Sequence, residues 1–344
     1  MRNFGYTFIA LLFVAAFLGL SLKLEVVQDF ALDIGAEFQA KRASAPLPES
    51  ESLRVYVCGS ASPLGVTDRA QACIAVLTPD HFYVIDSGAG STRNLVAGNL
   101  PLNRLQGVFI THFHSDHIAE IYEVNLNSWV MGRPTPLKVY GPAGVDEVTN
   151  AVNMGYRQDR LYRTEHHGAQ LLSPPLGVLE SQTINEGLVL QDGELTVTAY
   201  VAEHPPIHPA VGYRFDYGGR SVVISGDSNV TLKTEDISDG VDLLLHDALS
   251  VPVVSKMSEA ALEVGLTRIS KIAEDVIDYH ASVKSLIELK ADVGIVALYH
   301  LAPAPMNYMV EEIFKRDLPD NFLLAEDGMW FDLPRLSDRI MVPY

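Results

Sequence analysis

The run from His112 to His117, H-F-H-S-D-H, constrains this chain more than any other feature. It follows an apolar, strand-like segment, residues 107–110, and precedes a helix that we expect to begin at Ile118. Zinc accepts imidazole and carboxylate ligands, and a strand-to-helix turn allows alternate side chains to converge. Because one ion cannot easily take four ligands from so short a segment, the spacing suits two adjacent metals, with two of these residues on each. A histidine-rich solvated turn is the alternative interpretation.

The H-x-H-x-D-H pattern resembles the metallo-β-lactamase superfamily, and three residues downstream fit the ligand set of that family. His204 closes an apolar run, Asp227 ends a strand-like segment in S-G-D, and His300 ends another apolar run near the C-terminus. The resemblance implies an α/β fold, the four-layer αββα sandwich, with two zinc ions at the shared edge of its two sheets. It assigns His112, His114 and His204 to one zinc, Asp116, His117 and His300 to the other, and Asp227 as the bridge.

Two further segments resemble one branch of the superfamily, which contains ribonuclease Z and arylsulfatase-like enzymes. Residues 243–248, which include His246, resemble the L-I-H-E-A segment of that branch. Residues 279–282, which include His280, resemble its H-S-T or H-T-S motif, with Ala281 as a departure. Three more segments resemble this branch: 57–63 its G-T-G-S-P loop, 85–88 its L-D-C-G strand end and 325–329 its closing D-G strand. The resemblance covers about residues 53–333 in all.

The implied chemistry is the hydrolysis of an ester. Zinc lowers the pKa of a bound water to about 7, which supplies a nucleophile at neutral pH. Asp116 would both ligate and accept a hydrogen bond from this nucleophile, while the leaving oxygen needs a proton. His280 is the candidate donor because the H-S-T position of the branch faces the scissile group, and His246 is the second candidate, as a proton relay or an orienting residue. Asp86, at a strand end, is expected to accept a hydrogen bond from a ligand imidazole.

Four functions compete: hydrolysis of a phosphodiester, as in ribonuclease Z; hydrolysis of a sulfate ester, as in the arylsulfatase-like enzymes; hydrolysis of a lactam, lactone or thioester; and a metal-binding domain without activity. The complete ligand set weighs against the last, and the two branch motifs weigh against the third. The first is retained, with the sulfate ester as its main alternative.

A tRNA substrate is not expected. Ribonuclease Z carries a basic, glycine-rich arm between its third histidine motif and the bridging aspartate, whereas only 22 residues separate His204 from Asp227, enough for a hairpin through Gly218 and Gly219. The net charge is −18, and nucleic-acid surfaces need clustered Lys and Arg. We therefore expect a small anionic ester as the substrate.

The region 148–186 is an unusual insert between the two groups of motifs. It contains Tyr156, Arg163, His166 and His167, which would contact an anionic substrate if the region forms a lid over the metals. The alternative is a helix-loop insert whose arginines pair with nearby acids.

From residue 53 onward, short β-type runs alternate with helical stretches, which implies layered sheets. The pattern predicts a helical stretch over about 258–290. It predicts strands at 53–58, 73–77, 82–86, 108–111, 138–140, 195–201, 211–215, 221–225, 241–245 and 293–298.

The N-terminal part differs in character from the rest. Residues 3–22 carry no charge, and as a helix they would span the ~30 Å hydrocarbon core of a bilayer. We expect residues 1–22 to be a membrane anchor or, alternatively, a signal peptide, 23–50 a linker with some helical periodicity, and 51–344 the metallo-β-lactamase-fold hydrolase domain. The protein is therefore expected to be exported, periplasmic or extracytoplasmic, and membrane-tethered; a homodimer is left open.

The chain has two cysteines, Cys58 and Cys73. We expect two buried apolar thiols, since a disulfide requires a register that places the two residues opposite each other. An exported protein permits that disulfide, which is the alternative.

Overall fold

The computed structural model describes residues 23–44, 51–65 and 67–342. The chain forms two compact units, Met1–Pro48 and Glu49–Tyr344. In the first unit, helix α2 (Glu25–Ser44) lies in the segment expected to be a linker. The expected anchor lies outside the described residues, and within them no helix has the length and apolar character needed to cross a membrane.

The second unit contains two mixed sheets, each with seven strands among the described residues. The first sheet has the order β14-β1-β2-β3-β4-β5-β6, and β3 to β6 run parallel. Its strands are β1 (Ser52–Gly59), β2 (Cys73–Leu77), β3 (Phe82–Ile85), β4 (Gly107–Phe109), β5 (Leu137–Gly141), β6 (Leu179–Thr183) and β14 (Trp330–Pro334).

The second sheet has the order β13-β12-β11-β10-β9-β8-β7, and β10 to β13 run parallel. The interval between His204 and Asp227 holds the predicted hairpin, formed by β9 and β10 around Gly218 and Gly219. The strands are β7 (Gly187–Asp192), β8 (Leu195–Val201), β9 (Val211–Tyr217), β10 (Arg220–Ile224), β11 (Val241–Leu249), β12 (Val293–Ala302) and β13 (Phe322–Leu324).

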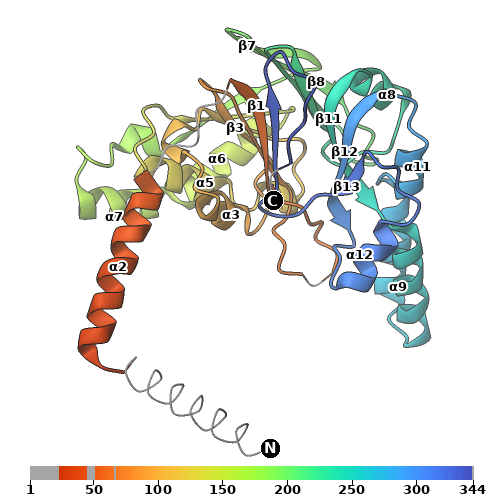
Figure 1. Cartoon of the computed structure of the whole chain (residues 1–344), viewed down its shortest axis with the longest axis horizontal. Coiled ribbons are helices and arrows are strands. Elements are labelled where there is room, and N and C mark those ends of the chain that lie inside the picture. Colours follow the sequence, from red (N-terminus) through yellow and green to blue (C-terminus); the bar gives the residue numbers. More distant parts are fainter. Residues whose placement is uncertain (1–22, 45–50, 66, 343–344) are drawn as a thin grey trace, which may run out of the picture. The chain divides into compact units, whose positions relative to one another are not determined.

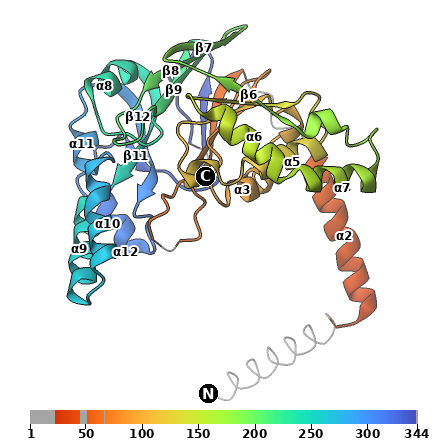
Figure 2. The same ribbon diagram turned by 180° about the vertical axis from the view of Figure 1, so that it is seen from behind.

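One apolar core fills the space between the sheets, with Val55 and Phe331 contributed by the first and Val197, Phe215 and Leu243 by the second. Apolar side chains that both sheets bury in this way are the main stabilising term of a layered fold. The outer faces carry helices, which Figures 1 and 2 show on the two sides of the paired sheets. The predicted αββα sandwich is therefore confirmed.

Each sheet is covered on its outer face by its own set of helices. Helices α3 (Ser91–Ala97) and α6 (Val145–Gly155) contact strands of the first sheet. A second apolar cluster packs α8 (Leu232–Ser238), α11 (Val283–Ile287) and α12 (Tyr308–Phe314) on the outer face of the second sheet.

Two expectations about secondary structure were incomplete or wrong. The helical stretch expected over 258–290 is instead α9 (Val251–Glu263), α10 (Thr267–Asp275), the short 3₁₀ helix η3 (Val276–Asp278) and α11. It is broken at Gly265, whose φ of +80° leaves the helical region, and again at residues 279–282. Strands β6, β7, β13 and β14 were not predicted. Strands β6 and β7 are largely exposed at the edges of the sheets, and β13 is short. Strand β14 follows directly after the segment 325–329, which resembles the closing strand of the branch.

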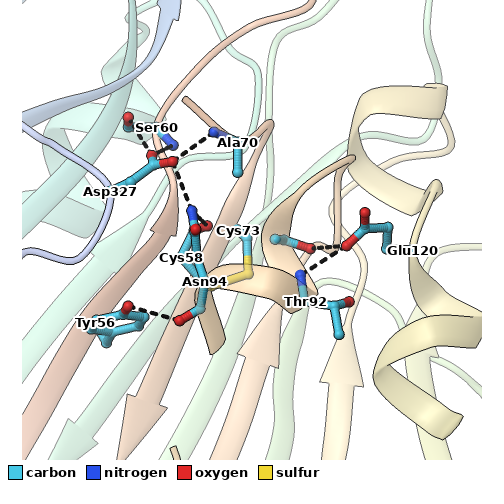
Figure 3. The surroundings of a disulfide bond; sticks show 10 residues. Tyr56, Cys58, Ser60, Ala70, Cys73, Thr92, Asn94, Glu120 and Asp327 are labelled. Carbon is cyan, nitrogen blue, oxygen red and sulfur yellow. Dashed lines mark hydrogen bonds between the residues drawn. A yellow bond between two sulfur atoms is a disulfide. The ribbon is translucent and has the colours of Figure 1, made fainter. Parts of the chain in front are cut away.

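The two cysteines form a disulfide, so the expectation of free thiols was wrong. A bulge in β1 at Cys58 shifts the register, and the Cα atoms of Cys58 and Cys73 come within 4.9 Å of each other. Figure 3 shows the carboxylate of Asp327 beside this bridge, where it accepts hydrogen bonds from Ser60 and from the Asn94 amide. The bridge joins β1 to the first residue of β2, and the carboxylate joins the segment before β14 to residues that follow β1 and precede β2.

Candidate metal centre

The strands that carry the site end at the same edge of the two sheets. Strands β3 and β4 run parallel, as do β10, β11 and β12, and β8 has the same direction as β10 because both are antiparallel to β9. The carboxyl ends of parallel strands form the edge where open α/β sheets bind ligands. The predicted metal ligands follow or end four of these strands: His112 and His114 after β4, His204 after β8, Asp227 after β10 and His300 in β12.

The helix expected from Ile118 begins earlier. It is a single turn, α4 (Ser115–Ile118), which carries Asp116 and His117, and α5 (Ile121–Val130) follows it. Two residues of this edge, Asp86 and His300, have left-handed φ values of 58° and 44°. Non-glycine residues rarely adopt this region, and such conformations gather at functional sites.

Asp227 lies at the centre of the predicted ligands, and its two oxygens face different partners. Oδ2 lies 3.8 Å from Nε2 of both His112 and His204. Oδ1 lies 3.3 Å from His117 Nε2 and 3.3 Å from His300 Nδ1. One buried carboxylate thus separates two groups of imidazoles.

Three groups of ligand-type atoms occur among the described residues; the third joins Asp227 to Asp247 and His280, and the other two contain the predicted ligands. In each, one side-chain atom per residue lies within 4.8 Å of the others. His114 Nδ1 is 2.9 Å from His112 Nε2, and Asp116 Oδ2 is 3.0 Å from His300 Nε2. The clusters are His112, His114, His204 and Asp227, and Asp116, His117, Asp227 and His300, with Asp227 in both.

The donor atoms fit a cation. His117 Nε2, His300 Nδ1 and Asp227 Oδ1 are buried without a hydrogen-bond partner in the described part of the chain. Buried polar atoms normally have hydrogen-bond partners, so three buried donor atoms that face one another without a partner indicate a site that fits a cation. Neutral imidazoles and carboxylates are also the donor set of divalent metal sites. The clusters and the fold therefore indicate that the protein binds a divalent metal.

The electrostatics of the site agree with this donor set. Burial lowers the pKa of His112, His114 and His204 below the ordinary value, so these imidazoles are neutral at pH 7, as a metal ligand must be. Burial acts against the charged form of His117, yet the carboxylates of Asp227 and Asp86 raise its pKa well above the ordinary value. A positive charge is therefore favoured between these carboxylates, where a metal ion would provide it.

Outer hydrogen bonds orient the imidazoles. The bond expected of Asp86 is present: its Oδ2 accepts from His117 Nδ1 at 2.8 Å, and Thr111 donates to both of its oxygens. His204 Nδ1 donates to the main-chain oxygen of Tyr279 at 2.9 Å. Because Nδ1 is occupied in both rings, Nε2 is the nitrogen left to face the clusters.

His280 and His246 meet at a residue whose role the motifs had not revealed, Asp247. Its Oδ2 accepts from His280 Nδ1 at 2.8 Å. Its main-chain oxygen accepts from His246 Nδ1 at 2.9 Å, and its Oδ1 lies 2.9 Å from the same nitrogen. His280 Nδ1 also lies 4.0 Å from Asp227 Oδ2, so His280 borders the clusters, whereas His246 contacts Asp247. Asp247 occupies the position of the glutamate in the resembled L-I-H-E-A segment, and this was the signal that could have identified it.

The insert does not bring its predicted contacts to the clusters. Tyr156 stacks on Tyr122 of α5 at 3.7 Å between ring centroids, and Arg163 of α7 (Arg157–His167) pairs with Asp159 at 2.8 Å. His166 and His167 lie exposed at the end of α7. The alternative interpretation, an insert whose arginines pair with local acids, describes Arg163 correctly.

Fold and site together define a metal-dependent hydrolase of ester bonds. Residues 66–297 match the Metallo-beta-lactamase superfamily, and the chain belongs to this family. Among curated relatives, the ribonuclease Z of Mycobacterium bovis (strain BCG / Pasteur 1173P2) is 29% identical over 257 residues, which cover 73% of this chain and 87% of the relative. The ribonuclease Z of Mycobacterium marinum (strain ATCC BAA-535 / M) is 28% identical over the same shares.

Solved structures share the fold. The metallo-beta-lactamase fold protein YhfI from Bacillus subtilis aligns with a TM-score of 0.57 at 18% identity, over 82% of this chain and 99% of its own. The short form of human tRNase Z aligns with a TM-score of 0.54 at 18% identity, over the same shares. The predicted superfamily and the resemblance to ribonuclease Z are thereby confirmed.

Proposed function

We propose that the protein is a di-zinc phosphodiesterase. His112, His114 and His204 would hold one ion, Asp116, His117 and His300 the other, and Asp227 would bridge them. The observation that carries this proposal is the division of the Asp227 carboxylate, with one oxygen toward each group of imidazoles at 3.3–3.8 Å. A carboxylate placed in this way suits the two-metal arrangement of phosphoester hydrolysis.

When bound, the zinc ions would lower the pKa of a water molecule and polarise the ester. Asp116 would accept a hydrogen bond from the attacking water. His280 would donate a proton from Nε2 to the leaving oxygen, since Asp247 occupies its Nδ1. Asp247 would position His280 in this role, and His246 would hold Asp247 from the other side.

The choice of a phosphodiester rests on the relatives and on the motifs. The curated relatives carry the name ribonuclease Z, which favours an ester of phosphorus in RNA. The net charge of −18 and the short β9–β10 hairpin, where the resembled enzymes carry a basic arm, favour a smaller anionic ester over tRNA. A sulfate ester is the second candidate, because the same motifs resemble the arylsulfatase-like enzymes.

A substrate panel on the zinc-loaded protein tests the proposal. We expect turnover of bis(4-nitrophenyl) phosphate that a chelator abolishes and added zinc restores, with little turnover of 4-nitrophenyl sulfate or a cephalosporin. Dominant sulfate-ester turnover would replace the phosphodiester with the second candidate. Cleavage of a tRNA precursor at a rate far above that of the small diester would instead make RNA the substrate.

We also propose that the enzyme acts outside the cytoplasm and is tethered through its N-terminal segment. Two observations support this. The run 3–22 is free of charge, and Cys58 and Cys73 are joined in a disulfide, a bond that is common in exported proteins and rare in the cytosol.

A further inference from the structure

Tyr279 lies beside the proposed proton donor and has no role in the chemistry described above. Its ring centroid is 5.0 Å from that of His280 and 5.2 Å from that of His204, and its plane is nearly perpendicular to the latter, at 83°. Both imidazoles are buried, whereas Tyr279 is half-buried. The tyrosine ring therefore forms part of the surface between these histidines and the solvent.

The packing of Tyr279 fixes its position without using its hydroxyl. Its main-chain oxygen accepts the His204 hydrogen bond, so its backbone is held to the metal edge. Its ring packs, with Leu64, against an apolar cluster that includes Leu249 and Ala302. The Tyr279 hydroxyl makes no hydrogen bond to any described residue. It is also not one of the buried polar atoms that would need such a partner. A tyrosine that served only to fill the core would be buried, and one that served only to orient His204 would need no ring.

Leu64 packs against the same apolar cluster as Tyr279. Its main-chain oxygen accepts from Ala304, and its loop pairs with the segment that follows His300, where Ser62 donates to Leu301. Leu64 is half-buried, like Tyr279. An aromatic ring and an aliphatic side chain from two separate segments of the chain thus pack on one cluster, and both segments are held by the backbone to the edge that carries the metal ligands.

We propose that Tyr279, with Leu64, forms a recognition surface for a planar, aromatic leaving group. This inference rests on the proposed function, because it takes His280 as the donor to the leaving oxygen. A group attached to that oxygen would lie within reach of the ring next to His280. Aromatic rings attract other rings in edge-to-face or offset stacks, and nucleobases stack on them without regard to sequence. The substrate class inferred here is a phosphodiester whose leaving alcohol carries an aryl ring or a nucleobase close to the ester.

The test compares leaving groups of similar acidity that differ in shape. Methyl phenyl phosphate presents a planar ring, and methyl hexafluoroisopropyl phosphate presents an aliphatic group. Tyr279→Leu removes the ring and keeps an apolar side chain, Tyr279→Phe keeps the ring, and Tyr162→Leu is the matched control on α7, where the tyrosine is 54% exposed. Zinc content and melting temperature establish that each variant is folded and loaded.

We expect Tyr279→Leu to lower kcat/KM for the phenyl ester by roughly 2- to 10-fold, the range of an aromatic pair, with little change for the aliphatic ester. Tyr279→Phe and Tyr162→Leu should preserve the wild-type ratio between the two esters. Calorimetry gives an independent measurement: Tyr279→Leu should weaken the binding of phenylphosphonate by a similar factor while leaving that of cyclohexylphosphonate unchanged.

The outcomes separate this inference from the proposed function. If the wild-type protein hydrolyses neither diester, the proposed function fails and this inference fails with it. Suppose that the wild type hydrolyses both esters. If Tyr279→Leu then lowers kcat/KM equally for the two esters, or for neither of them, the recognition surface is refuted while the proposed function stands. Loss of the phenyl preference in Tyr279→Phe would also contradict it, because the hydroxyl rather than the ring would then be responsible.

Discussion

Replacing Asp247 with Asn tests whether this buried carboxylate positions His280. Oδ1 accepts from the main-chain nitrogen of Ser228 at 3.2 Å and lies 2.9 Å from His246 Nδ1. Among the described residues, the one donor to Oδ2 is His280 Nδ1, at 2.8 Å. An asparagine at this position keeps more hydrogen bonds if its oxygen replaces Oδ1 and its amide nitrogen replaces Oδ2. A donor would then face His280 Nδ1, so the imidazole would become an acceptor there and lose its anionic partner.

The size of the effect follows from that lost contact. A hydrogen bond to a charged group contributes about 1.5–3 kcal/mol. At 1.36 kcal/mol for each factor of ten in rate, its loss lowers turnover by roughly 10- to 100-fold on an ester with a poor leaving group. His280→Ala should lower turnover by roughly 10²–10⁴-fold, the usual scale of general acid catalysis. The double variant should be no slower than His280→Ala, because the two residues act as one unit.

The assay measures turnover on a poor and a good leaving group, together with zinc content and melting temperature. Esters of nitrophenol need little protonation, so Asp247→Asn and His280→Ala should lose far less activity on them. The matched control is Asp242→Asn in the same strand, β11, where the carboxylate pairs with Arg220 at 2.9 Å. This control should lose stability and keep its turnover. The reasoning would be refuted if Asp247→Asn hydrolysed the poor substrate at the wild-type rate, or if it lost zinc and activity on both substrates alike.

Three further predictions concern the metals, the disulfide and the N-terminus. Purified protein should contain two zinc ions per chain, and Asp227→Ala should lose both together; a single ion with full activity would exclude the two-metal site. Joint replacement of Cys58 and Cys73 by serine should lower the free energy of unfolding by about 3 kcal/mol, because the bridge closes a loop with a sequence separation of 15; an unchanged denaturation midpoint would contradict this. Cell fractionation should find full-length protein in the membrane, and deletion of residues 1–22 should release it; full-length protein in the soluble cytoplasm would disprove the anchor.

The superfamily and the positions of its ligands could be predicted because they depend on local order. His112, His114, Asp116 and His117 occupy one turn, and the remaining ligand candidates each follow an apolar run that reads as a strand. Parallel strands bring such positions to a common edge whatever the details of packing. The alternation of strands and helices also predicted the layered sheets, because the period and length of the apolar runs can be read locally from the sequence.

Features that depend on register or on contacts between distant segments could not be predicted in this way. The pairing of Cys58 with Cys73 depends on a one-residue bulge, and a shift of one residue turns a strand side chain to the opposite face. The hydrogen bond between Asp247 and His280 joins residues 33 positions apart, and the resemblance around Asp247 does not say which side chain its carboxylate contacts. The interruption of the helical stretch at 279–282 was also missed, because the residues before it keep helical periodicity up to the break.

The interruption at residues 279–282 contributes side chains to the site that are held differently from the metal ligands. The predicted metal ligands come from strand ends and the adjoining turn, and the two sheets hold them through backbone pairing. Tyr279 and His280 come from the segment between η3 and α11, which touches the metal edge through the Tyr279 main chain and through Asp247. Substitutions of these two side chains can therefore change which ester is recognised and how its leaving group departs while the metal ligands keep their backbone support. Metal content and substrate preference should vary independently across this segment, whereas substitutions of the strand-end ligands should change both together.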